Sequence, residues 1–474
     1  MPTSHPSGWA HADGAFRGPT WLPEPRDANA LVPHLWSRTA HKTDGVLHVG
    51  GAAVPDLVAE VNTPAYLLDE DDFRARARAF RTAFADSAGW DVYYAGKAFL
   101  CTAVARWVME EGLSLDVCTD GELSVALRAG VDPARIGFHG NNKSYAELRR
   151  AVSHGVGRII VDSFHEIDRL EQITTELGRT APVMVRVTPG VEAHTHEYIA
   201  TAHEDQKFGF SITGGDALDA VRRISAAPGL DLRGLHCHIG SQIFDSSGFE
   251  VAARRVLALQ ATVSTELGIT LPEMDLGGGF GIAYTTQDDP ADPSQLATEM
   301  TKIVEHECRA LGIEQPRLSI EPGRAIVGPS MCTVYTVGTV KEVSLDGGAR
   351  RRYVSVDGGM SDNIRTALYD ADYSCTLANR SSGSAPVLSR VVGKHCEAGD
   401  IVVKDEFLPG DVAPGDLVAV PGTGAYCWSM ASNYNHLLRP PVVAVREGVV
   451  RVLIRRETED DLLATDMGPD DEAR

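Results

Sequence analysis

The 474-residue sequence contains no uninterrupted apolar run of about 18 residues, so we expect no helix that crosses a membrane. Its N-terminal stretch lacks the apolar centre of a secretory signal. Its eight cysteines include no CxxC pair and form no regular framework, which favours buried free thiols in a reducing compartment. These absences together predict a cytoplasmic protein.

Positive charge is also scarce, because 44 Lys and Arg stand against 65 Asp and Glu, for a formal net charge of −21. This balance argues against binding to nucleic acid or to an anionic membrane, since both need an excess of positive charge. A local cluster of Arg and backbone N–H groups could still bind a small anion. The apolar fraction of 43% is typical of a globular protein and excludes general disorder.

Short β-rich runs alternate with helical patterns between residues 63 and 325. The runs cover 64–69, 91–96, 113–118, 135–140, 158–163, 182–189, 232–240, 273–279 and 317–323. Alternation of this kind indicates parallel βαβ units. Eight of the nine runs would form a (β/α)₈ TIM-type barrel and leave one spare strand for a neighbouring domain, so we predict an α/β barrel fold. A doubly wound open sheet is the alternative.

The pattern changes near residue 326, where strands follow one another with Gly, Pro and Asp turns and few helices. This favours a C-terminal all-β sandwich or barrel. The predicted parts are an N-terminal arm (1–45), a segment joining the β domain (46–62), the barrel (63–325), the β domain (326–456) and an acidic tail (457–474).

Barrel enzymes carry their chemistry at the carboxyl ends of the strands. Lys97 follows directly after the run 91–96, where burial would expose a nucleophilic amine; a surface lysine is the plain alternative. His236 and His238 end another run, two residues apart. They could bind a metal, stack on an aromatic cofactor, or be core histidines, and no third metal ligand is evident in the sequence.

Two further strand ends suggest a phosphate site. The run GGGFG supplies Gly277, Gly278, Gly279 and Gly281, whose N–H groups can approach an anion, although a tight turn explains them equally well. The run EPGR supplies Glu321, Gly323 and Arg324. Late strands of a barrel are the usual place for a phosphate, so we expect one here.

The β region offers isolated candidates. Arg365 and Tyr369 are spaced i, i+4, so they share a face if their segment is helical, and Arg suits a carboxylate. Cys396–Glu397 and Tyr426 are unremarkable taken singly, because a cysteine beside a carboxylate is usually a core residue.

The ordered motifs YYAGKA, HCHIGSQ, DLGGGFG, EPGR, VDGGMSDNIRTALY, CE and GAYCWSMASNYN run from about residue 45 to 455. Together they resemble the fold-type III pyridoxal-phosphate-dependent decarboxylases, most closely the diaminopimelate decarboxylases. The resemblance implies pyridoxal 5′-phosphate as the cofactor, no metal, and release of CO₂ from meso-2,6-diaminopimelate to give L-lysine, the last step of lysine biosynthesis.

The resemblance also implies residue roles. Lys97 would carry the cofactor covalently, His238 would lie against its ring, and Glu321 would bond its pyridine nitrogen. Its phosphate would be surrounded by Ser241, Gly278, Gly279, Gly323 and Arg324. The substrate would contact Arg324, Arg365, Tyr369, Glu397 and Tyr426, with Tyr426 also touching the cofactor. Cys396 would donate a proton.

The resemblance further implies a homodimer, because the Cys396–Glu397 segment of the family reaches the active site of the partner subunit. Thr366 departs from the family pattern, which usually has Pro there. The alternatives are a decarboxylase of another amino acid such as ornithine or arginine, an inactive cofactor-binding homologue, and a racemase. The polar loop 194–210 is either a lid over the substrate or a solvated connector.

Overall fold

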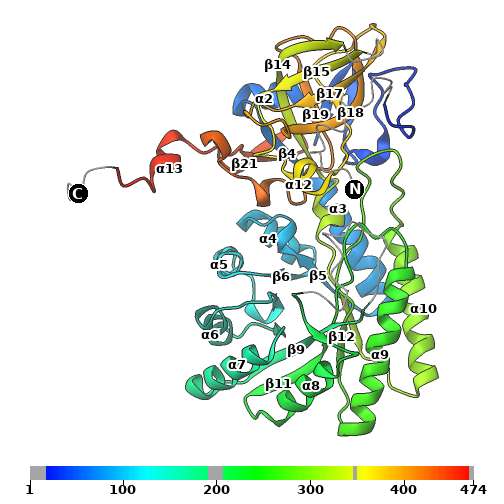
Figure 1. Ribbon diagram of the computed structural model, residues 1–474, viewed down its shortest axis with the longest axis vertical. Coiled ribbons are helices and arrows are strands. Elements are labelled where there is room, and N and C mark those ends of the chain that lie inside the picture. Colours follow the sequence, from blue (N-terminus) through cyan, green and yellow to red (C-terminus); the bar gives the residue numbers. More distant parts are fainter. Residues whose placement is uncertain (1–17, 191–206, 345–349, 469–474) are drawn as a thin grey trace. The chain divides into compact units, whose positions relative to one another are not determined.

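A computed structural model of the chain describes residues 18–190, 207–344 and 350–468 (Figure 1). The chain divides into two compact units. The barrel unit comprises Arg74–Ile282 and Asp289–Ile326, and the β unit comprises Met1–Phe73, Ala283–Asp288 and Val327–Arg474. The N-terminal end of the predicted arm and most of the loop 194–210, expected to be either a lid or a solvated connector, lie outside the described residues.

The barrel unit contains a closed sheet of eight parallel strands. They are β5 (Asp91–Ala95), β6 (Ser114–Val117), β7 (Ile136–Phe138), β8 (Arg158–Val161), β9 (Ala181–Thr188), β11 (Leu230–His236), β12 (Glu273–Asp275) and β13 (Arg317–Ile320). Each strand pairs in parallel with the next, and β13 pairs with β5 to close the ring. The two-residue strand β10 (Phe210–Ser211) pairs with β9. The TIM-type prediction is therefore confirmed, and the open-sheet alternative is wrong.

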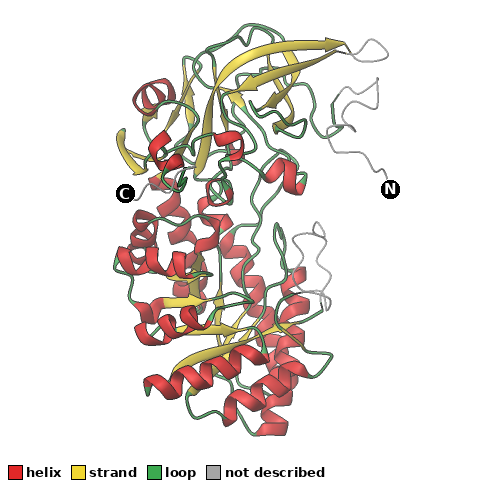
Figure 2. Ribbon diagram, turned by 60° about the vertical axis from the view of Figure 1, so that its left-hand side comes forward, coloured by secondary structure: helices red, strands yellow, loops and turns green. Residues whose placement is uncertain are grey.

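Helices surround these strands, as Figure 2 shows. They are α3 (Glu70–Phe80), the π-helix η2 (Arg81–Asp86), α4 (Thr102–Glu110), α5 (Asp120–Ala129), α6 (Tyr145–His154), α7 (Phe164–Leu177), α8 (Asp216–Ala226), α9 (Ser247–Leu267) and α10 (Pro293–Leu311), with short turns η3 (Gly96–Ala98), η4 (Pro133–Arg135) and α11 (Arg324–Val327).

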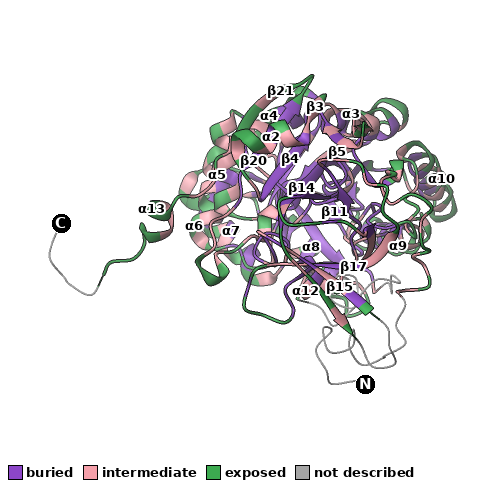
Figure 3. Ribbon diagram, turned by 90° about the horizontal axis from the view of Figure 1, so that it is seen from above, coloured by how far each residue is buried: buried purple, intermediate pink, exposed green. Residues whose placement is uncertain are grey.

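The helix boundaries follow from local chemistry. The side chains of Thr119, Ser144 and Ser163 accept a hydrogen bond from the third residue of α5, α6 and α7, which satisfies a backbone N–H that the helix leaves free. Left-handed glycines end the same helices, because glycine adopts a positive φ without steric cost. The strand residues between them are mostly buried, as the purple ribbons in Figure 3 show.

The spare ninth run, 64–69, forms β4 (Ala65–Asp69) of the β unit, as expected for a strand claimed by a neighbouring domain. It pairs antiparallel with β14 (Met331–Ser344) and parallel with β20 (Val442–Arg446). All five β4 residues are buried, whereas a strand with one wet face would alternate. Because a fully buried strand reads the same in the barrel sheet and in the sheet of the β unit, the sequence of β4 does not show which of the two it joins.

The remaining elements of the β unit confirm a β-rich C-terminal domain. Its strands are β1 (His41–Thr43), β2 (Val46–Val49), β3 (Ala52–Ala53), β15 (Arg350–Val356), β16 (Thr376–Leu377), β17 (Pro386–Val392), β18 (Ile401–Pro409), β19 (Leu417–Val420) and β21 (Val449–Ile454). Its helices are η1 (Pro33–Leu35), α2 (Val54–Val61), α12 (Arg365–Tyr369), η6 (Trp428–Met430), η7 (Tyr434–His436) and α13 (Glu459–Leu463). Among the described residues, no helix is long and apolar enough to cross a membrane.

Candidate active site

Lys97 lies in the turn η3, directly after β5, at the carboxyl end of the barrel strands. Gly96 and Ala98 on either side are buried, whereas the Lys97 side chain is exposed. The desolvation that the sequence suggested for this lysine is therefore absent from the single chain. The position is otherwise as predicted, because the lysine stands where barrel enzymes place their reacting groups.

His238 follows β11 and is electrostatically coupled to Lys97. Burial lowers the pKa of His238 well below its ordinary value, and the positive charge of Lys97 lowers it further. Nδ1 of His238 accepts a hydrogen bond of 3.2 Å from the N–H of Gly278. His238 is therefore a neutral imidazole tied to the glycine turn after β12.

That glycine turn tolerates no side chain. A Cβ at Gly278 would lie 2.3 Å from the carbonyl oxygen of Glu321, and a Cβ at Gly279, where φ is +109°, would lie 2.6 Å from that of Gly240. Beside the turn, Nη2 of Arg324 donates to Oγ of Ser241 over 2.8 Å. The predicted anion-binding residues of the barrel are thus gathered at neighbouring strand ends.

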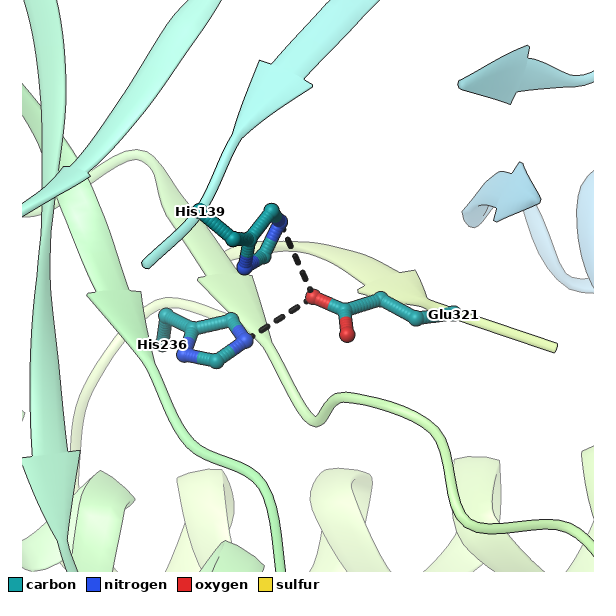
Figure 4. Close-up of side chains that lie close together, drawn as sticks. All are labelled: His139, His236 and Glu321. Carbon is teal, nitrogen blue, oxygen red and sulfur yellow. Dashed lines mark hydrogen bonds and ion pairs between the residues drawn. The ribbon is translucent and has the colours of Figure 1, made fainter. Parts of the chain in front are cut away.

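Glu321 directly follows the last barrel strand, β13, and is 6% exposed. One of its oxygens, Oε1, lies 2.8 Å from Nε2 of His236 and 3.5 Å from Nε2 of His139 (Figure 4). Burial acts to raise the pKa of Glu321, but the two imidazoles hold it well below its usual value. His236 therefore contacts Glu321, and these three residues form a group of possible metal ligands that the sequence did not reveal.

Arg365 opens the short helix α12, so the segment that joins it to Tyr369 is helical. Its guanidinium lies 4.5 Å from the ring centre of Tyr284 and donates a hydrogen bond of 2.5 Å to the hydroxyl of Tyr373. The residue is 5% exposed, and its Nε is buried without a hydrogen bond to any described residue. Tyr369, at the other end of α12, is half-buried.

Cys396 and Glu397 lie on an exposed turn. Cys396 is the exposed member of the eight cysteines. The turn is held by Asp400, which accepts hydrogen bonds from the N–H groups of Met360 (2.6 Å) and His395 (2.7 Å). A rigidly held, exposed thiol differs from the buried core cysteine that the sequence made the plain alternative.

Tyr426 is half-buried and adopts a φ of +68°. A bulky residue with positive φ is uncommon, and such strain concentrates at functional sites. This conformation singles out Tyr426 more strongly than its sequence context does.

Sequence reasoning missed three residues that the structure brings against predicted ones: His139 at Glu321, and Tyr284 and Tyr373 at Arg365. His139 stands at the end of a predicted strand, so its position offered a signal. Tyr284 is distant from Arg365 along the chain, and Tyr373 belongs to no helix or strand, so no sequence pattern pointed to either residue.

The chain resembles known proteins along most of its length. A family model described as "Pyridoxal-dependent decarboxylase, pyridoxal binding domain" matches residues 70–328. Diaminopimelate decarboxylase of Mycobacterium tuberculosis is 54% identical over 442 residues, covering 92% of this chain and 98% of the relative. The Bacillus subtilis enzyme of the same name is 44% identical, covering 89% and 95%.

Solved structures agree with these relatives. Diaminopimelate decarboxylase from M. jannaschii in complex with L-lysine matches with a TM-score of 0.84 at 30% identity, covering 91% of this chain and 98% of that one. The barrel, the lysine after its first strand and the glycine turn are thus accompanied by similarity over nearly the whole chain. The chain belongs to the diaminopimelate decarboxylases, within the pyridoxal-dependent decarboxylase family.

Proposed function

We propose that this chain releases CO₂ from meso-2,6-diaminopimelate to give L-lysine, with pyridoxal 5′-phosphate held at Lys97. One observation carries the proposal: Lys97, the glycine turn, Arg324 and Glu321 stand on neighbouring strand ends of one closed barrel. Pyridoxal phosphate supplies an electron sink for the electron pair that remains when CO₂ leaves an amino acid. The side chains around it bind, orient and move protons.

The barrel residues fit this cofactor. Lys97 is exposed and carries the amine that a covalent bond to the cofactor needs. Gly278 and Gly279, which lack a side chain, suit a phosphate together with Gly323, Ser241 and Arg324. The neutral His238 can lie flat against an aromatic ring. The ionised Glu321 can bond the ring nitrogen and favour its protonated form, because opposite charges stabilise each other at short range.

Substrate recognition falls to Arg324, Arg365, Tyr369, Glu397 and Tyr426. Diaminopimelate has a second carboxylate that does not react, and a substrate such as ornithine lacks it. The buried guanidinium of Arg365 suits such a group, since Arg binds carboxylates through two parallel hydrogen bonds. Glu397 would contact the amino group at the far end of the substrate.

Cys396 would donate the proton that replaces CO₂. Its exposure in the single chain, together with that of Glu397, supports a homodimer in which this turn completes the active site of the partner subunit. A cytoplasmic location, in keeping with free thiols, belongs to the same proposal.

Borohydride reduction of the cofactor-loaded protein, followed by peptide mapping, tests the attachment site. We expect the label on Lys97, its loss in Lys97→Ala, and normal labelling in the matched control Lys341→Ala, which removes another exposed lysine. CO₂ release from diaminopimelate tests the reaction. Turnover of ornithine or arginine in its place would overturn the substrate assignment.

Mixing two inactive variants tests the shared site. Lys97→Ala and Cys396→Ala should regain about a quarter of wild-type activity when subunits exchange, because half of the dimers are mixed and each has one intact site. No recovery in a mixture shown to exchange subunits would contradict the dimeric site.

A further inference from the structure

We propose that His236, with His139 packed beside it, is a positioning residue that holds one oxygen of Glu321 and so fixes the direction of the other oxygen towards the ring nitrogen of the cofactor. The inference deepens the proposed function and rests on it. His139 and His236 are buried and have no other role in the proposed reaction.

The geometry carries the first step. His236 comes from the last residue of β11 and His139 from the residue after β7, so they reach Glu321 from different strands. Both Nε2 atoms approach the same oxygen, Oε1, at 2.8 Å and 3.5 Å. In Figure 4 the second oxygen of Glu321 points away from both rings. The carboxylate is thus fixed on one side and available on the other.

The buried hydrogen bond from His236 is the second step. The exposed fractions are 1% for His236, 7% for His139 and 6% for Glu321. Nε2 of His236 can donate its N–H to Oε1 of Glu321 over 2.8 Å. A hydrogen bond shielded from water is electrostatically stronger than an exposed one, so it restrains the direction of the carboxylate.

His139 also lies beside a buried carboxyl group. Its Nε2 lies 3.1 Å from Oδ1 of Asp116, a carboxyl group that burial makes hard to ionise, so that its pKa is raised well above the ordinary value. A Cβ on Gly137 would lie 2.2 Å from the same Asp116 oxygen, so the glycine leaves room for this carboxyl group. The lack of a side chain at position 137 therefore allows Asp116 to lie beside His139.

Further buried contacts connect Asp116 to the glycine turn that is predicted to bind the phosphate. Arg158 binds Asp275 over 2.5 Å and Ser319 over 2.9 Å, and it lies 3.9 Å from Asp116. The other oxygen of Asp275 accepts the N–H of Gly277 over 2.7 Å. One buried network therefore orients the carboxylate for the ring nitrogen and the turn for the phosphate.

A double-mutant cycle separates positioning from a merely structural role. His236→Leu removes the N–H that reaches Oε1, whereas His236→Gln retains an N–H donor on a side chain of similar reach. We expect His236→Leu to weaken pyridoxal-phosphate binding, measured by equilibrium dialysis, by about tenfold to a hundredfold, the range for a hydrogen bond to a charged group. His236→Gln should recover most of this loss. In the Glu321→Gln background, His236→Leu should add less than a twofold change, because the charge it positions is gone.

The protonation of the cofactor's ring nitrogen is a second readout. In the nitrogen NMR spectrum of protein loaded with ring-¹⁵N pyridoxal phosphate, His236→Leu should move the ring-nitrogen signal at about pH 8 towards that of an unprotonated pyridine, and His139→Leu should do so to a smaller degree, because its contact is longer. Gln260→Leu, which removes another buried polar side chain of the barrel unit, is the control and should alter neither readout.

Equal losses from His236→Leu in the wild-type and Glu321→Gln backgrounds would overturn the proposal, since they would show a structural effect that is independent of Glu321. A zinc ion held stoichiometrically by the wild-type apoprotein and lost in His236→Leu would also overturn it. Should His236→Leu fail to fold, the same cycle with His139→Leu decides. Borohydride labelling of Lys97 in the wild-type protein tests the proposed function separately, so the two failures are distinguishable.

Discussion

Arg365→Met should make the protein more stable while it removes most of its activity. Arg365 is 5% exposed, and none of the ion pairs among the described residues involves it. Its charge is met by the ring of Tyr284 at 4.5 Å and the hydroxyl of Tyr373. A buried charge of this kind is costly for the folded chain alone and useful once a carboxylate arrives.

The effect on stability is the difference between the cost of burying the guanidinium and the free energy of its two favourable contacts. Removing a guanidinium from water costs several kcal/mol. The contact with the aromatic rings returns about 2 kcal/mol when desolvated, and the hydrogen bond to Tyr373 returns about 2 kcal/mol. A residual penalty of about 1 kcal/mol disappears in Arg365→Met, which raises the Tm of the β unit by about 3 °C. The lost carboxylate contact costs about 3 kcal/mol, or roughly a hundredfold in kcat/KM.

Differential scanning calorimetry of the apoprotein and CO₂ release from diaminopimelate measure the two effects. Arg380→Met is the control, because Arg380 of the same unit binds Asp416 through two nitrogens, at 2.8 Å and 2.7 Å, and its loss should lower the Tm by several degrees. If Arg365→Met lowers the Tm as much as Arg380→Met does, the folded chain satisfies the guanidinium of Arg365 and its burial carries no penalty.

Iodoacetamide should modify Cys396 before the other cysteines, and Cys396→Ser should reduce CO₂ release at least a hundredfold while the buried Cys308→Ser retains it; first labelling of a buried cysteine would contradict this. Gly279→Ala should weaken pyridoxal-phosphate binding at least tenfold in a fluorescence titration, because its Cβ meets a carbonyl at 2.6 Å, whereas Gly130→Ala, with a positive φ but open space around it, should leave binding unchanged. Burial raises the pKa of Glu406 from 4.5 to about 7, so the folded protein keeps a proton that the unfolded chain releases. The contribution of Glu406 to stability should therefore fall by roughly 3 kcal/mol as the pH rises from about 4.5 to about 7 and level off above, and Glu406→Gln should reduce the slope of the urea-denaturation profile by this amount.

The barrel was predictable because its strands are short, apolar and separated by helical patterns, and each of the nine runs is a strand. The one ambiguous run, 64–69, joins the β unit, and only its pairing with β14 and β20 reveals this. A fully buried strand has the same apolar composition in either sheet, so the sequence could count the strands without assigning this one.

In the candidate site, too, some residues were predictable from the sequence and others were not. The residues that carry the resemblance lie in short motifs at strand ends, where position alone suggests chemistry, and their roles stay predictions. Their supporting partners were not predictable. His139 reaches Glu321 across 182 positions of the chain, and Tyr373 holds Arg365 through a contact between a short helix and the loop that follows it.

By itself, the sequence determined the order of strands and helices, the position of Lys97 after the first barrel strand, the glycines that must lack a side chain, and the family. These follow from local chemistry: apolar periodicity, capping and backbone freedom act over a few residues. Only the tertiary structure decided which polar and charged side chains are buried together, as with the two histidines beside one oxygen of Glu321 and the guanidinium of Arg365 beside aromatic groups. Electrostatic strength depends on burial and on distance through space, and neither can be read from separation along the chain.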